Sequence, residues 1–132
     1  MNSEKILVDT TVWVLYFRGD ETVKDKMLSL ILEDKIVTTE IVIMETLRGA
    51  RTQKGYSQLY DDFKAIPLLN LNKTSWERCY MVGFQLRRAG ITVPVADILI
   101  AVQATHYNHP LLHRDKHFSL MAKIIGLEEI QI

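Results

Sequence analysis

Four carboxylates stand in apolar surroundings, and their type and spacing could do chemistry. Asp9 ends the run ILVD, Glu45 interrupts IVIMETL, Asp97 lies inside VPVADILIAV, and Asp115 follows LLHR. An inward-facing carboxylate is costly unless it is protonated, paired or bound to a cation. Carboxylates that share one cleft repel each other unless a divalent ion holds them. Oxygen ligands favour Mg²⁺ or Mn²⁺ over zinc, and these ions promote phosphodiester hydrolysis by activating water.

Each of these acids also has a purely structural explanation. Asp9 and Asp115 could cap the helices that follow them. Asp97 falls in the first turn after Pro94, where an acid suits the helix dipole, and Glu45 could face solvent. The four explanations are not independent, because a single fold must place all four acids. Their spacing and their positions at strand ends favour a shared functional site over four separate structural roles.

Two of the acids project from helix faces that are otherwise apolar. Glu45 shares a face with Ile41 and Val42, which precede it by four and three residues. Asp97 shares a face with the small Ala101, which allows that face to approach a sheet closely. We therefore expect both carboxylates to point inward.

The elements that position these acids alternate between short apolar runs and amphipathic stretches. We expect strands at residues 5–8, 35–38, 66–69, 110–113 and 129–132. We expect helices at about 12–17, 21–33, 39–48, 54–65, 74–88, 95–107 and 116–125. This alternation predicts an α/β fold, a mostly parallel sheet of about five strands flanked by helices. Asp9 and Asp115 then lie at the carboxyl ends of strands, where such sheets bind ligands.

Composition narrows the class of protein. The chain has 132 residues, which fits one domain over 1–132. Lys plus Arg and Asp plus Glu balance at 16 each, so any nucleic-acid contact must depend on local patches. Cys79 is the single cysteine, and no long apolar run suggests a signal peptide or membrane span. We expect a cytoplasmic protein with no membrane association.

The acidic motifs together resemble those of PIN-domain ribonuclease toxins of the VapC type. DTTVWVLYFRG, ETLRGAR and LRRAGITVPVADILIAVQATHYNHPLLHRDKHF follow the family's order and approximate spacing, and the likeness runs from residue 5 to 130. The resemblance implies a PIN-like domain and a metal-dependent endoribonuclease that cleaves tRNA, rRNA or mRNA. It also implies the toxin half of a type II toxin–antitoxin pair, usually a homodimer, inhibited by an antitoxin segment in the groove near the acids.

The same resemblance assigns roles to individual residues. It implies that Asp9 and Asp97 are ligands of Mg²⁺ or Mn²⁺. Glu45 and Asp115 complete the catalytic cluster by binding metal or orienting the attacking water. Thr11 matches a hydroxyl that faces the cleft.

Two histidines depart from the family pattern. His113 replaces a frequent Thr or Ser, and His117 replaces a frequent acid, which weakens the case for a second tightly bound metal. His106, His109, His113 and His117 follow no zinc-binding spacing, and we expect them on the surface or in the core. Two arginines are candidate contacts for RNA phosphates. Arg48 closely follows Glu45, and Arg114 directly precedes Asp115.

Two other functions compete with the nuclease. A strand followed by Asp9 and a Thr is similar to the pattern of haloacid-dehalogenase phosphatases, but that pattern needs a second Asp where Thr11 stands. A PIN-fold interaction module without catalysis would keep the fold and the partner groove, although none of the four acids is missing here.

Overall fold

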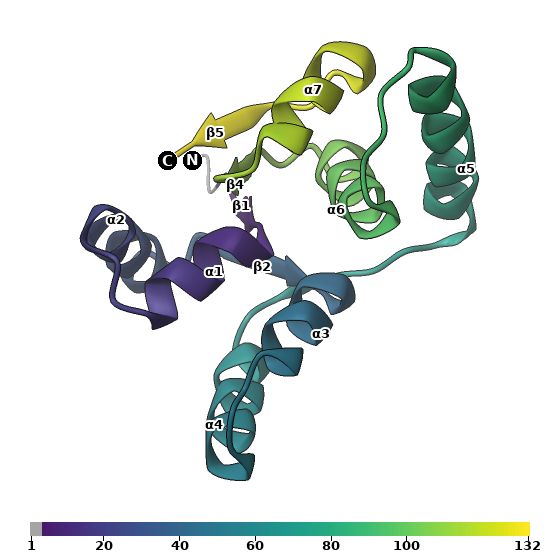
Figure 1. Cartoon of the computed structure of the whole chain (residues 1–132). Coiled ribbons are helices and arrows are strands. Elements are labelled where there is room, and N and C mark those ends of the chain that lie inside the picture. Colours follow the sequence, from purple (N-terminus) through teal and green to yellow (C-terminus); the bar gives the residue numbers. More distant parts are fainter. Residues whose placement is uncertain (1–3) are drawn as a thin grey trace.

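The computed structural model describes residues 4–132, and in this range the chain forms seven helices and five strands (Figure 1). In chain order these are β1 (Ile6–Val8), α1 (Thr10–Phe17), α2 (Glu21–Leu32), β2 (Ile36–Thr39), α3 (Glu40–Arg48), α4 (Gln53–Lys64), β3 (Leu68–Leu69), α5 (Lys73–Arg88), α6 (Val95–His106), β4 (Leu111–His113), α7 (Lys116–Ile125) and β5 (Glu129–Gln131). The predicted domain over 1–132 begins in residues 1–3, which lie outside the described part.

The five strands form one parallel sheet in the order β3-β2-β1-β4-β5. The chain starts in the middle at β1, builds outward through β2 and β3, and then crosses back to β4 and β5 on the other side. The strand order therefore reverses between β1 and β4, which pair with Val8 opposite Leu112. Parallel α/β sheets bind ligands at this switch point. The predicted α/β class is confirmed, and every strand pair is parallel.

Helices cover both sides of the central strands. Figure 1 shows α1 and α2 on one side and α5 and α6 on the other. In the middle of the sheet Leu7, Val8, Leu111 and Leu112 are fully buried. The most buried helix is α6, where Ile100, Ala101 and Ala104 are inaccessible to solvent. The small residues on the predicted face of α6 thus pack against the core.

Local chemistry explains where the elements begin and end. Thr39 accepts a hydrogen bond from the Val42 amide at 3.1 Å, so it closes β2 and caps α3. The third strand is shorter than predicted because Pro67 has no N–H to donate; its carbonyl accepts from the Thr38 amide at 3.0 Å. Gly126 ends α7 with φ of 70°, a conformation that favours glycine. In residues 4–132 none of the helices combines the length and apolar character needed to cross a membrane.

Candidate metal site at the switch point of the sheet

Asp9 follows β1 directly and is the N-cap of α1. Its Oδ2 accepts hydrogen bonds from the Thr11 amide at 3.1 Å and the Thr11 hydroxyl at 2.6 Å. The side chain is buried, with 2% of the residue exposed. Burial raises the pKa of Asp9, the hydrogen bonds from Thr11 oppose this rise, and the negative charge of Asp115 adds to it. The capping explanation is therefore correct, and the same carboxylate also interacts with a second acid.

Asp115 caps α7 just beyond the end of β4. Its Oδ1 accepts from the His117 amide at 2.9 Å, and its own amide donates to Nδ1 of His113 at 3.1 Å. His113 is fully buried, and its Nε2 lies 2.9 Å from Oε1 of Glu129. Because Nδ1 accepts a hydrogen bond, neutral His113 carries its proton on Nε2 and donates it to Glu129. His113 is thus a core residue, as predicted, and it fixes the backbone at Asp115.

Asp97 lies in the first turn of α6 and is buried. Burial raises its pKa to about 6, with further contributions from the charges of Asp115 and Asp9, while His117 acts in the opposite direction. Three carboxylates from distant parts of the chain therefore lie close enough to repel one another. A divalent cation would relieve this repulsion.

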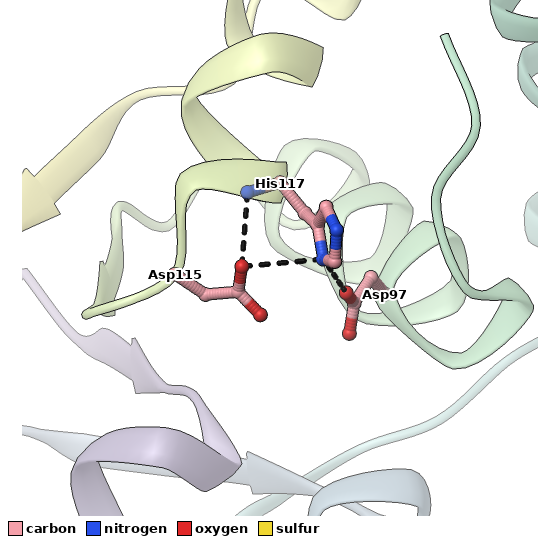
Figure 2. A group of neighbouring side chains, drawn as sticks. All are labelled: Asp97, Asp115 and His117. Atoms are coloured by element: carbon pink, nitrogen blue, oxygen red, sulfur yellow. Dashed lines mark hydrogen bonds and ion pairs between the residues drawn. The ribbon is translucent and has the colours of Figure 1, made fainter.

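His117 lies between two of these carboxylates, as Figure 2 shows. Its Nδ1 is 3.1 Å from Oδ2 of Asp97 and 3.2 Å from Oδ1 of Asp115. The three atoms that could bind a metal lie within 4.8 Å of one another. The sequence predicts His117 on the surface or in the core; its side chain is partly exposed, and it lies beside the acids, a contact that was not predicted. The available signal was its position two residues after Asp115, where the family pattern often has an acid.

Glu45 reaches the same region from α3. Its Oε1 accepts a hydrogen bond from the Thr10 hydroxyl at 2.7 Å, and Thr10 is the neighbour of Asp9. The side chain is half-buried, so the solvent-facing explanation does not describe it. The structure therefore connects the fourth acid to the site through Thr10.

The Thr11 hydroxyl also lies at the site. It donates to Oδ2 of Asp9 at 2.6 Å and accepts from the Arg114 amide at 3.3 Å. This one side chain joins the segment after β1 to the segment after β4. Its chemical effect is to stabilise the charged form of Asp9.

The two candidate arginines differ in position. Arg48 is exposed at the end of α3. The guanidinium of Arg114 contacts the protein itself: Nε donates to the Ile132 carbonyl at 2.8 Å, Nη2 donates to the Thr22 hydroxyl at 2.9 Å, and Nη1 lies 3.9 Å from Asp20. A phosphate contact by Arg114 would have to break these interactions.

The donor set fits a divalent cation. Asp97, Asp115 and His117 offer two carboxylate oxygens and one imidazole nitrogen that lie within 4.8 Å of one another. Asp9 lies outside this group of three, but near enough for its charge to raise the pKa of Asp97. Mg²⁺ and Mn²⁺ accept carboxylate oxygens, and Mn²⁺ also accepts imidazole. The arrangement can hold such an ion at the carboxyl ends of β1 and β4.

Comparison with protein families identifies the domain. The family model described as PIN domain matches residues 6–124, which is most of the chain. The chain belongs to the PIN-domain family.

Named relatives of this PIN domain are ribonucleases. It is 30% identical over 128 residues to Ribonuclease VapC11 of Mycobacterium tuberculosis, covering 93% of this chain and 96% of the relative. A VapC ribonuclease of Mycobacterium bovis matches at the same identity, length and coverage. Among solved structures, VapBC2 of Rickettsia felis, bound to a DNA fragment from its promoter, aligns with a TM-score of 0.79 at 16% identity, over 96% of this chain and 98% of that one. At 16% identity, the similarity to VapBC2 shows that the two proteins share a fold.

Proposed function

We propose that this PIN domain is a metal-dependent endoribonuclease, and that it is the toxin of a toxin–antitoxin pair. The observation that carries the proposal is the grouping of Asp97 and Asp115 with His117 at the switch point of the sheet. Asp9 lies near enough for its charge to raise the pKa of Asp97. Burial and mutual repulsion raise the pKa of Asp9 and of Asp97, as in a site built around a cation. The 30% identity to proteins named VapC ribonucleases supports RNA as the substrate.

Each acid has a proposed role. Asp9 and Asp97 are ligands of Mg²⁺ or Mn²⁺, and Asp115 and Glu45 complete the cluster by binding the ion or orienting water. A bound divalent ion supplies an activated water molecule and positive charge for the leaving oxygen of the phosphodiester. Thr11 keeps Asp9 charged and oriented through the hydrogen bond at 2.6 Å.

RNA must approach a cluster of negative charge, so cations near the site would help binding. We assign this role first to Arg48, which is exposed three residues after Glu45 on α3. Arg114 is the second candidate, although its guanidinium has protein partners. The RNA backbone would then lie across the carboxyl ends of the strands.

The proposed protein partners are a cognate antitoxin and a second copy of the chain, in the cytoplasm. A cavity of about 520 Å³ beside α1, lined by Trp13, Tyr16, Phe17 and Phe63 among others, offers an apolar surface for an antitoxin segment. None of the four acids lines this cavity, so such a segment would have to extend further to reach them.

The exposed side chains of Tyr80, Met81 and Phe84 on α5 support an interface between copies of the chain. A monomer by light scattering at working concentration would contradict dimerisation.

The proposed activity is tested by incubating the purified, antitoxin-free chain with total RNA and Mn²⁺ or Mg²⁺. An EDTA control and an Asp9→Asn variant run alongside. Discrete fragments that disappear with EDTA and in the variant are the expected result. Intact RNA from folded, metal-loaded protein would favour a PIN-fold interaction module without catalysis.

A further inference from the structure

His117 lies between Asp97 and Asp115. It is the second residue of α7, and its amide is bound by Oδ1 of Asp115 at 2.9 Å. Its ring nitrogen Nδ1 faces both carboxylates at 3.1 and 3.2 Å, and its side chain is 30% exposed (Figure 2). The imidazole therefore occupies the space between two acids that the proposed function assigns to metal binding.

The separations match those of ligands around one ion. Two ligands at right angles, with bonds of about 2.1 to 2.2 Å, lie about 3.0 Å apart. Nδ1 stands 3.1 Å from Oδ2 of Asp97 and 3.2 Å from Oδ1 of Asp115. All three atoms lie within 4.8 Å of one another, so these separations are compatible with three ligands of one ion.

A simple ion pair explains the same contacts less well. A single Nδ1 proton can point along a straight line to only one carboxylate, so the second contact at a similar distance is poorly aligned. A metal ion accepts lone pairs from all three atoms at once, which needs Nδ1 without its proton. One ion can therefore contact His117, Asp97 and Asp115 together, whereas the proton on Nδ1 forms a well-aligned hydrogen bond with only one of the two carboxylates.

From this geometry we propose that His117 binds the divalent ion directly through Nδ1 and makes the site prefer Mn²⁺ to Mg²⁺. The inference rests on the proposed function, since the ion is the one that the acids hold. Mg²⁺ is bound in proteins by oxygen ligands and keeps several waters, whereas imidazole is a good ligand for transition metals. In this chain the His117 imidazole stands where the family pattern often has a carboxylate. The preference of the site therefore changes from Mg²⁺ towards Mn²⁺.

The direct test is pulsed electron paramagnetic resonance of the Mn²⁺-loaded full chain. A directly bound imidazole gives a nitrogen hyperfine coupling to Mn²⁺. We expect this coupling in the wild type and in a His106→Asn control, and its loss in His117→Asp and His117→Asn. Circular dichroism verifies that each variant is folded.

Calorimetric titration supplies the second measurement. The ratio of Mn²⁺ to Mg²⁺ affinity should fall by about tenfold or more in His117→Asp, because the site becomes all-oxygen. His106→Asn should leave the ratio unchanged.

Two results would overturn the inference, and they are distinguishable. Mn²⁺ bound to the wild type without nitrogen coupling would show that His117 only pairs with the acids, and the proposed nuclease would stand. A folded wild type that binds neither ion would remove both the inference and the proposed metal-dependent function.

Discussion

The Thr10 hydroxyl donates a hydrogen bond of 2.7 Å to Oε1 of Glu45, 35 positions further along the chain. The contact joins the first residue of α1 to the middle of α3, and these two helices pack together. Thr10 also follows Asp9, so one backbone turn positions two of the four acids. Glu45 is thereby oriented by a residue that does not itself belong to the acidic cluster.

Replacing Thr10 should therefore weaken catalysis more than folding. Thr10→Val keeps the shape and removes the hydroxyl, so Glu45 loses the hydrogen bond of 2.7 Å that orients it. Because the Glu45 side chain is only half-buried, water can replace the lost partner. We expect the rate of RNA cleavage to fall about tenfold, with a change below about 1 kcal/mol in the free energy of unfolding. Thr10→Ser, which keeps the hydroxyl, is the matched control. A Thr10→Val enzyme with the wild-type rate would exclude this positioning role.

Thr11 should control metal affinity through Asp9. Its hydroxyl and amide lower the pKa of Asp9, against the effect of burial. Thr11→Val removes the hydroxyl bond at 2.6 Å, so the Asp9 pKa rises further and protons compete better with the metal. Titration with Mn²⁺ at pH 6 should show about tenfold weaker binding, a smaller loss at pH 8, and near wild-type binding for Thr11→Ser. If the wild type and Thr11→Val bound Mn²⁺ with equal affinity at pH 6 and at pH 8, this effect of Thr11 on metal binding would be excluded.

Asp97 should destabilise the metal-free protein at neutral pH. Its pKa is raised to about 6 in the folded state from 3.8, so the folded state holds the proton more tightly than the unfolded chain. Asp97 therefore opposes folding most above pH 6, and the penalty disappears as the pH falls towards 4. In EDTA at pH 7.5, Asp97→Asn should raise the free energy of unfolding by about 1–3 kcal/mol, a gain that vanishes near pH 4.

Urea unfolding at several pH values measures this effect, and Mn²⁺ should reverse it. The ion should stabilise the wild type and leave Asp97→Asn nearly unchanged, because binding to the folded state raises stability. An Asp97→Asn protein that is less stable than the wild type in EDTA at pH 7.5 would contradict the electrostatic explanation.

His113 should be a structural support of Asp115. His113→Leu removes the acceptor for the Asp115 amide and the donor to Glu129. Leaving these groups unpaired should lower the free energy of unfolding by about 2–4 kcal/mol, measured in urea. Glu129→Gln keeps an acceptor for His113 and should cost less than about 1 kcal/mol. Similar losses in the two variants would mean that the contact with the Asp115 amide contributes little.

Much of the fold follows from local signals in the sequence. Strands and helices alternate at the predicted places because apolar runs, caps such as Asp9 and Thr39, and stops such as Gly126 act over a few residues. The strand-end positions of Asp9 and Asp115 follow from the same alternation, since parallel strands place their carboxyl ends together.

The contacts that complete the site depend on packing between distant elements. The direction of His117 depends on how α7 meets α6, and the partner of Glu45 depends on how α3 meets α1. Arg114 shows the limit of sequence proximity, since it precedes Asp115 but its guanidinium reaches Thr22 and the Ile132 carbonyl. No periodicity within one element specifies these directions.

The most direct test of the central claim is the chemistry of the RNA ends, measured by mass spectrometry after cleavage in ¹⁸O-labelled water with Mn²⁺. Hydrolysis by water at the cluster of Asp9, Asp97 and Asp115 predicts fragments with a terminal phosphate that carries one solvent oxygen, formed only with a divalent ion. It also predicts that Asp9→Asn abolishes them. Fragments that end in 2′,3′-cyclic phosphate, or that form equally in EDTA, would contradict the account.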